Sequence, residues 1–281
     1  LEFRRVLFRS EPVLASAITA IDRGQLYYRG RNVADLSRTE TLESVAAWLW
    51  QSDQPPLAPA QTGALDGPDG KTRAFQALAL AAARAGPLRG RHMDVLRGEA
   101  GQVLNLLADA IAGPDAGQAE GQAAGRAADP GPIHQRLARA WGCDHMGQDL
   151  VRQALVLLAD HELNASTFAA RVAASTGASL AASALAGLCA LSGPLHGGMF
   201  ARVRAFMDEV AQRGAVGAIQ ARLDRGAALP GFGHPLYPEG DPRARVLLQA
   251  MTLPAKYGEA LHTGLDLIGT PPNIDFALAA L

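Results

Sequence analysis

The chain has 281 residues, with 26 Lys and Arg against 27 Asp and Glu, so its formal net charge is −1. This balance offers no basic surface for a nucleic acid. Hydrophobic residues make up 48% of the chain, enough for the core of one large or two modest globular domains. Cys143 and Cys189 stand apart without a CxxC pattern, which argues against a disulfide framework or a zinc ribbon and favours a reducing, cytoplasmic location.

The two ends of the chain are unusual. Residues 1–10 read as translated sequencing adapter joined to protein sequence, with a genuine amphipathic start as the alternative, and we set them aside. Their three Arg and one Glu add +2, so without them the formal charge changes from −1 to about −3. The chain stops at Leu281 within an expected helix. We therefore expect an internal fragment of a longer protein.

The first elements include the one stretch expected to be extended. It lies within residues 16–32, where Gln25-Leu-Tyr-Tyr28 precedes Arg29-Gly30. Helices are expected after it, because the chain is rich in Ala, Leu and Arg. Thr41 is a candidate N-cap for a helix with apolar residues at positions 42, 45 and 49. Further amphipathic helices are expected at 72–85 and 148–159.

The middle of the chain alternates between weak and strong helical patterns. Residues 113–131 carry no large apolar side chain, so we predict a flexible insertion there. An Ala-rich helix is expected over 175–192, and its Ser and Gly residues favour a buried core helix over a membrane span. Another helix should start at Met199, directly after two glycines, and Pro242 suits the first position of a further helix. Neither sequence repeats nor alternating strands and helices occur, which excludes a doubly wound sheet.

Three separate segments place a titratable residue beside glycine or proline. They are Leu191-Ser-Gly-Pro-Leu-His196-Gly-Gly198, Pro230-Gly-Phe-Gly-His234 and Pro272-Asn-Ile-Asp275-Phe276. The two glycines after His196 allow an unstrained turn and close approach by a ligand, and the following helix would direct its positive end at the imidazole. This arrangement favours a neutral imidazole that donates one hydrogen bond. A structural histidine at a helix start is the alternative.

Two other candidates, His234 and Asp275, each allow two interpretations. The turn around His234 restricts its position, and His234 is either catalytic or a plain loop histidine. Arg243, nine residues later, suits bidentate pairing with a carboxylate. Asp275 is either a catalytic base or a helix cap.

His161 lies within Asp160-His-Glu162-Leu-Asn164. A metalloprotease motif would need a second histidine where Ala165 stands, so no metal site is expected here or elsewhere. His161 is therefore either a substrate ligand or a buried helix histidine. Its polar neighbours are expected to make structural contacts only.

In their order and rough spacing, these segments resemble the active-site segments of the citrate synthase family. Ala159-Asp-His161-Glu162 extends the likeness, which runs from about Ser16 to the last residue. The resemblance implies an all-α, two-domain fold. A large helical domain would cover residues 11–196, and a smaller closing domain would cover 197–281 and lack its C-terminal part.

The resemblance also implies a reaction. Such an enzyme condenses acetyl-CoA with oxaloacetate to citrate and CoA by enolisation, aldol addition and thioester hydrolysis, as a homodimer and without a cofactor or metal. Asp275 would take the proton from acetyl-CoA, His196 would hydrogen-bond the enolate, and His234 would polarise the ketone of oxaloacetate. His161 and Arg243 would bind the carboxylates of oxaloacetate.

The sequence departs from the family pattern where relatives often carry basic residues for the phosphates of CoA. Pro235, Pro238 and Gly269-Thr270 stand there instead, which leaves open how CoA would bind. The family's remaining pocket arginines follow the end of this chain, so we expect the chain alone to lack useful activity.

Several alternatives stay open. Within the family they are 2-methylcitrate synthesis from propionyl-CoA and cleavage of citryl-CoA. From another class, the chain could be a regulatory protein that binds oxaloacetate or CoA without turnover. A nucleic acid is expected as a partner only if a missing N-terminal domain binds it.

Overall fold

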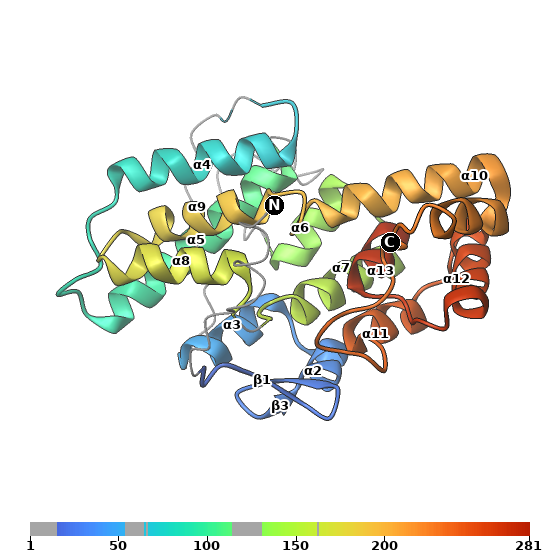
Figure 1. Cartoon of the computed structure of the whole chain (residues 1–281). Coiled ribbons are helices and arrows are strands. Elements are labelled where there is room, and N and C mark those ends of the chain that lie inside the picture. The colour runs from blue at the N-terminus through green and yellow to red at the C-terminus, as the bar shows by residue number, and fades with distance from the viewer. Residues whose placement is uncertain (1–15, 54–64, 66, 114–130, 162) are drawn as a thin grey trace, which may run out of the picture.

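The computed structural model describes residues 16–53, 65, 67–113, 131–161 and 163–281. Within these ranges the chain is mostly helical, with a small sheet near its start (Figure 1), and the all-α prediction is confirmed. The predicted adapter, residues 1–10, lies outside the described residues, as does all of the predicted insertion except Gly113 and Gly131. The strands are β1 Thr19–Asp22, β2 Gln25–Tyr28 and β3 Arg31–Asn32. The helices are α2 Val33–Thr39, α3 Leu42–Trp50, α4 Gly70–Arg84, α5 Met93–Ala112, α6 Ile133–Ala140, α7 His145–Leu157, α8 Ala165–Ser175, α9 Leu180–Leu191, α10 Met199–Leu223, α11 Pro242–Ala250, α12 Ala255–Ile268 and α13 Ile274–Ala280.

The predicted extended stretch forms an antiparallel sheet in the order β1-β2-β3. Both connections are two-residue turns in which an arginine and a glycine have positive φ, 47° and 70° at Arg23-Gly24 and 46° and 83° at Arg29-Gly30. Such turns match the twist of paired strands. The sheet buries Leu26 and Tyr28 against the helices.

Capping residues set the helix starts that the sequence predicts. Thr41 and Ser44 form a capping box at the start of α3, and Pro242 is the first residue of α11 behind the cap Asp241. The helices predicted at 72–85 and 148–159 begin earlier, because Asp69 caps α4 and Asp144 caps α7.

The helix predicted over 175–192 is wrong at its N-terminal end. Gly177 has a φ of 85°, which interrupts the helical path after α8, and Ser179 then caps α9. Helix α10 begins at Met199 as predicted, but it bends at Gly214, whose φ is 72°.

Two hydrophobic cores hold the C-terminal helices. The first packs β2, α2, α3 and α7 against α11 and α13, with fully buried Tyr28, Val156 and Leu247. The second packs α10, α12 and α13 around Phe206, Ile219 and Phe276. The first core therefore joins residues on both sides of position 197, and the domain boundary expected there stays a prediction. None of the described helices is long and apolar enough to cross a membrane.

Candidate active site

His161 lies in the turn between α7 and α8, and Tyr28 holds the residue before it. The Tyr28 hydroxyl donates to the Asp160 carbonyl oxygen at 2.9 Å, with the Leu157 carbonyl oxygen at 3.2 Å, and accepts from the Asp160 amide at 3.1 Å. Thr19 Oγ1 also donates to the Asp160 carboxylate. The reading of His161 as a buried helix histidine is wrong, since it lies outside the helices and is half-buried. The small sheet therefore positions His161.

The segments around His234 and Asp275 lie side by side. The Gly233 amide donates to the Pro271 carbonyl oxygen, and the Asn273 amide donates to the Gly231 carbonyl oxygen, each at 2.8 Å. Asn273 Nδ2 also donates to the Gly233 carbonyl oxygen at 2.8 Å. Gly231 has a φ of 83°, and a Cβ there would lie 3.0 Å from Phe276 Cβ. Glycine therefore lets the two segments approach.

Asn273, rather than Asp275, caps α13, and the helix-cap reading of Asp275 is wrong. The Asn273 side chain accepts a hydrogen bond from the Asp275 amide at 3.0 Å. Asp275 occupies the first turn of α13, where a carboxylate interacts favourably with the helix dipole.

Arg243 is buried and pairs with Asp241. Its Nε and Nη2 donate to the two oxygens of the Asp241 carboxylate at 2.9 and 2.8 Å. The same carboxylate accepts from the Ile274 amide at 3.1 Å. Asp241 therefore occupies one edge of the Arg243 guanidinium, the group that the family resemblance assigns to a substrate carboxylate.

An aromatic cluster joins these segments. The rings of His161 and His234 are perpendicular, with their centroids 5.3 Å apart. His161 Nε2 lies 3.0 Å from the Tyr237 hydroxyl in a hydrogen bond. The Tyr237 ring lies 4.9 Å from that of His234 and 5.5 Å from the Arg243 guanidinium carbon. Tyr237 thus contacts both histidines and the arginine.

Burial and the neighbouring charges shift the pKa values of this cluster. Burial first, then the charges of Arg243 and His234, lowers the pKa of His161 to about 3. Burial and Arg243 also lower the pKa of His234, so both imidazoles are neutral near pH 7. The pKa of Asp275 is raised, mainly by burial, although Arg243 opposes the shift. The site therefore combines two neutral imidazoles with a carboxylate whose proton affinity is increased.

His196 lies apart from these contacts, in the turn that connects α9 to α10. Its Nε2 lies 2.9 Å from Ser166 Oγ in a hydrogen bond, and burial lowers its pKa. None of its described hydrogen bonds, ring contacts or charge interactions reaches His161, His234, Arg243 or Asp275.

The glycines after His196 serve their own turn. A Cβ on Gly197 would lie 2.6 Å from the Leu191 carbonyl oxygen, and one on Gly198 would lie 2.6 Å from Pro194 Cα. Close packing of the backbone thus requires both glycines, in addition to the ligand approach inferred from the sequence.

The family model for the C-terminal domain of citrate synthase matches residues 7–264, most of the chain. The chain belongs to the citrate synthase family. Citrate synthase 2 of Bacillus subtilis is 39% identical over 140 residues, which cover 46% of this chain and 38% of that protein. The 2-methylcitrate synthase of Shewanella oneidensis is 37% identical over 108 residues, 38% of this chain and 29% of that protein. The chain therefore matches well under half the length of either relative.

A solved citrate synthase supports the fold. The ternary complex of the Thermoplasma acidophilum enzyme with carboxymethyl coenzyme A and oxaloacetate has a TM-score of 0.69 and 22% identity. The match covers 95% of this chain and 81% of that chain. At this identity the likeness shows the citrate synthase fold of helical domains.

Three residues of this citrate synthase-like site have no assigned role in the sequence analysis. Tyr237 and Asp241 lie between His234 and Arg243, so their position near a motif is a signal that sequence could have used. Tyr28 lies far from every motif, and no sequence signal connects it to His161. The structure brings together His161, His234, Arg243 and Asp275, and their roles in a citrate synthase reaction stay predictions.

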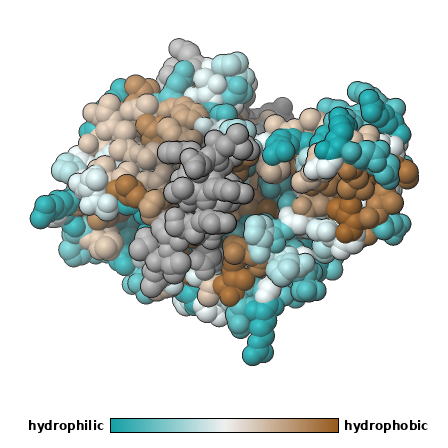
Figure 2. Space-filling model, in the orientation of Figure 1, coloured by the Kyte–Doolittle hydropathy of each residue, from teal (hydrophilic) through white to brown (hydrophobic). Residues whose placement is uncertain are grey.

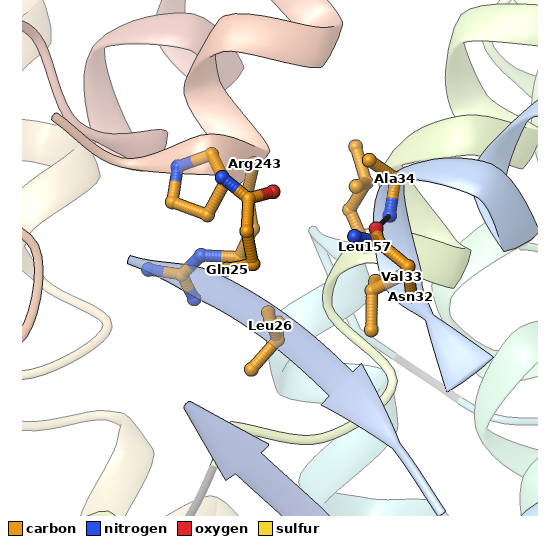
Figure 3. A pocket seen from close by; sticks show the side chains of 8 residues that line it. Gln25, Leu26, Asn32, Val33, Ala34, Leu157 and Arg243 are labelled. Carbon is orange, nitrogen blue, oxygen red and sulfur yellow. Dashed lines mark hydrogen bonds between the residues drawn. The ribbon is translucent and has the colours of Figure 1, made fainter. Parts of the chain in front are cut away.

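A small pocket lies beside Arg243, between the sheet and α11 (Figure 3). Its empty space of about 180 Å³ is partly open to solvent, and apolar side chains line most of it, among them Leu26, Val33 and Leu157. It has no room for a water-sized molecule, whereas typical ligand sites have volumes of roughly 300–1,000 Å³. The pocket therefore does not mark the citrate synthase substrate site. Among the described residues, no three His, Cys, Asp or Glu side chains are arranged to hold a metal ion.

Proposed function

We propose that this chain carries the active site of an acyltransferase that condenses acetyl-CoA with oxaloacetate to give citrate and CoA. The observation that supports it most is the convergence of His161, His234, Arg243 and Asp275 from separate parts of a citrate synthase-family chain. A carboxylate base, neutral hydrogen-bond donors and a carboxylate-binding guanidinium are what the condensation requires.

Asp275 is the proposed base. Its carboxylate would take a proton from the methyl group of acetyl-CoA, and the electrons of the C–H bond would pass into an enolate. A base is more effective when its pKa lies nearer that of the reacting group. Burial raises the pKa of Asp275 and so favours this step. His196 is proposed to hydrogen-bond the enolate oxygen, since burial keeps its imidazole neutral.

His234 is proposed to act on oxaloacetate. The enolate carbon would attack the ketone carbon, and the neutral imidazole of His234 would donate its ring proton to the alkoxide that forms. His234 would regain a proton from solvent as Asp275 releases the one it took from acetyl-CoA. Water would then cleave the thioester of citryl-CoA and release the CoA thiol. His161 and Arg243 would hold the carboxylates of oxaloacetate, with the lowered pKa of His161 keeping its imidazole uncharged beside Arg243.

The test follows thiol release from acetyl-CoA with and without oxaloacetate. It uses the 281-residue chain and, in parallel, the protein that its source gene encodes. We expect oxaloacetate-dependent release from the protein that the source gene encodes and its loss in the His234→Ala and Asp275→Asn variants of that protein, whereas the 281-residue chain alone should release little thiol. His262→Ala is the matched control, because His262 is exposed on α12 and, within the described residues, its ring makes a hydrogen bond only with the Gly258 carbonyl oxygen of its own helix. Equal activity in His234→Ala and His262→Ala would contradict the proposal.

The closest alternative reaction uses a different acyl-CoA: 2-methylcitrate would be formed from propionyl-CoA. One methylene changes binding by only about 1–3 kcal/mol. A higher kcat/KM with propionyl-CoA than with acetyl-CoA would assign the chain to that reaction. Formation of acetyl-CoA and oxaloacetate from added citryl-CoA, with no release of CoA thiol, would favour a lyase.

A metabolite-binding protein without turnover is the second candidate. Exposed Pro235 and Pro238 at positions where relatives often carry CoA-binding basic residues favour it. It predicts that oxaloacetate raises the melting temperature while no acyl-CoA releases thiol. Turnover that disappears in Asp275→Asn would exclude it.

We further propose that the working protein is a cytoplasmic homodimer. Helix α8 contributes no fully buried side chain, and it packs beside α9, which packs beside α4. Leu80, Val172 and Leu191 on these three helices are each more than two-fifths exposed, and apolar side chains cover much of this side in Figure 2. A second copy would bury them. Light scattering that gives the mass of one chain would contradict the dimer.

A further inference from the structure

Asp241 carries no role in the reaction proposed above, yet it is the most completely enclosed charged group beside the site. Its side chain is 0% exposed. Burial opposes its ionisation, but the hydrogen bonds and charge of Arg243 lower its pKa below the ordinary value. Asp241 is therefore an anion within the protein interior. A buried anion persists only where bonds and an opposite charge compensate for lost water.

The hydrogen bonds of Asp241 fill all of its accepting positions. Oδ1 accepts from the Arg243 amide at 3.0 Å and from Arg243 Nε at 2.9 Å. Oδ2 accepts from Arg243 Nη2 at 2.8 Å and from the Ile274 amide at 3.1 Å. An ionised carboxylate has about four such positions. Asp241 therefore has one fixed orientation, shared with Arg243 and with the start of α13.

This pairing decides which part of Arg243 can reach a substrate. A guanidinium has two edges that can pair with a carboxylate, one formed by Nε and Nη2 and the other by Nη1 and Nη2. Asp241 occupies the first edge. Nη1 makes no hydrogen bond with the described part of the chain. Only the second edge remains for a ligand.

The bond to the Ile274 amide connects the same carboxylate to the proposed base, since Asp275 is the next residue. The charge of Asp241 also acts on Asp275 and raises its pKa, whereas Arg243 lowers it. Removal of the Asp241 charge would leave the Arg243 charge uncompensated. Asp275 would then hold its proton less tightly.

We propose that Asp241 is the positioning residue of this site: it fixes Arg243 so that the Nη1–Nη2 edge binds a substrate carboxylate, and it sets the position of Asp275 through Ile274. The inference rests on the proposed function. A purely structural role as the cap of α11 predicts a loss of stability and no other change.

The test compares Asp241→Asn with wild type and with Asp144→Asn. Asparagine caps helices about as well as aspartate, so the start of α11 is kept while the charge and one acceptor are lost. Asp144 is the matched control, because it caps α7 through the Gly147 amide at 2.8 Å and is exposed. Calorimetry gives the Kd for oxaloacetate, and thiol release gives the pH profile of kcat/KM.

We expect Asp241→Asn to raise the Kd for oxaloacetate about tenfold or more, since a misplaced charge-assisted pair loses most of its contribution. The acid limb of kcat/KM should move to lower pH, because the pKa of Asp275 falls. In an Arg243→Met background, Asp241→Asn should cause no further loss of oxaloacetate affinity. Asp144→Asn should change neither quantity.

The other outcomes distinguish failure of the proposed function from failure of the role of Asp241. If the wild-type protein that the source gene encodes neither binds oxaloacetate nor releases thiol, the proposed function and this inference are both overturned. Wild-type binding with an unchanged Kd or acid limb in Asp241→Asn would overturn the role of Asp241 alone, as would a loss that persists with Arg243→Met.

Asp241→Glu replaces this test if Asp241→Asn does not fold. It keeps the charge and displaces Arg243. A raised Kd with an unmoved acid limb would support the role, and an unchanged Kd would overturn it.

Discussion

Replacement of Tyr28 by Phe tests whether the small sheet positions His161. The substitution removes one hydroxyl from a fully buried side chain and keeps the ring. That hydroxyl donates to the Asp160 carbonyl oxygen and accepts from the Asp160 amide, at 2.9 and 3.1 Å. Both bonds hold the residue directly before His161.

The expected loss of stability follows from these two bonds. A typical intramolecular hydrogen bond contributes about 1 kcal/mol, and a buried group left without a partner costs about 1–3 kcal/mol. Phe at position 28 would remove the hydroxyl that accepts from the partly buried Asp160 amide. We expect the free energy of unfolding to fall by about 2–3 kcal/mol, which lowers the Tm by roughly 3–5 °C in a chain of this size.

The measurement is thermal and urea unfolding of both proteins, together with the Kd for oxaloacetate. Tyr27→Phe is the matched control. Tyr27 is the neighbouring residue of the same strand, and its hydroxyl makes no hydrogen bond with the described residues. We expect Tyr28→Phe alone to weaken oxaloacetate binding, by about tenfold, because a small displacement of a ligand group is costly. If the two variants lose equal stability and bind oxaloacetate equally, the sheet does not position His161.

Three further predictions rest on single residues. Asp275→Asn should abolish thiol release without loss of stability at pH 7, because burial penalises the ionised carboxylate. In the wild type, kcat/KM should fall on acidification as the Asp275 carboxylate takes up its proton, at a pH above the ordinary Asp pKa of about 3.8. The pKa of His161 is about 3 in the folded protein and 6.5 in the unfolded chain, so the unfolded state binds the proton more tightly. The free energy of unfolding should therefore fall as the pH drops from 6.5 towards 3, by about 2–3 kcal/mol at pH 4.5. In urea unfolding, the stability of His161→Gln should depend less steeply on pH. Gly198→Ala should destabilise the protein by about 2 kcal/mol or more in calorimetry, because its Cβ would meet Pro194, whereas Gly217→Ala in α10 should be neutral or stabilising.

Local sequence was sufficient for features that depend on neighbouring residues. Thr41 and Pro242 mark helix starts through capping and a fixed φ, and those effects involve residues within one turn. Gly30 ends the predicted extended stretch, and its positive φ of 83° places it in a turn of the sheet. The prediction of a helix over 175–192 was wrong at its start, because it rested on the Ala-rich composition. Gly177 adopts a positive φ that interrupts the helix there.

Family resemblance extended the prediction to His161, His234, Arg243 and Asp275, which the structure brings together. It did not supply their relation to one another. Arg243 appeared free to fork onto a substrate, but Asp241 occupies one of its edges. His196, named on the same evidence, makes its described side-chain hydrogen bond to Ser166 instead.

The sequence by itself therefore determined the helical class, the starts of α3, α10 and α11, and the residue types of the candidate site. Tertiary structure alone decided that Tyr28 holds the turn before His161, that Tyr237 lies between two histidines and Arg243, and that one buried carboxylate joins Arg243 to the start of α13. The physical reason is distance along the chain. Capping and turn preferences act between neighbours, whereas these contacts form only after the hydrophobic cores have packed β2, α7, α11 and α13 together.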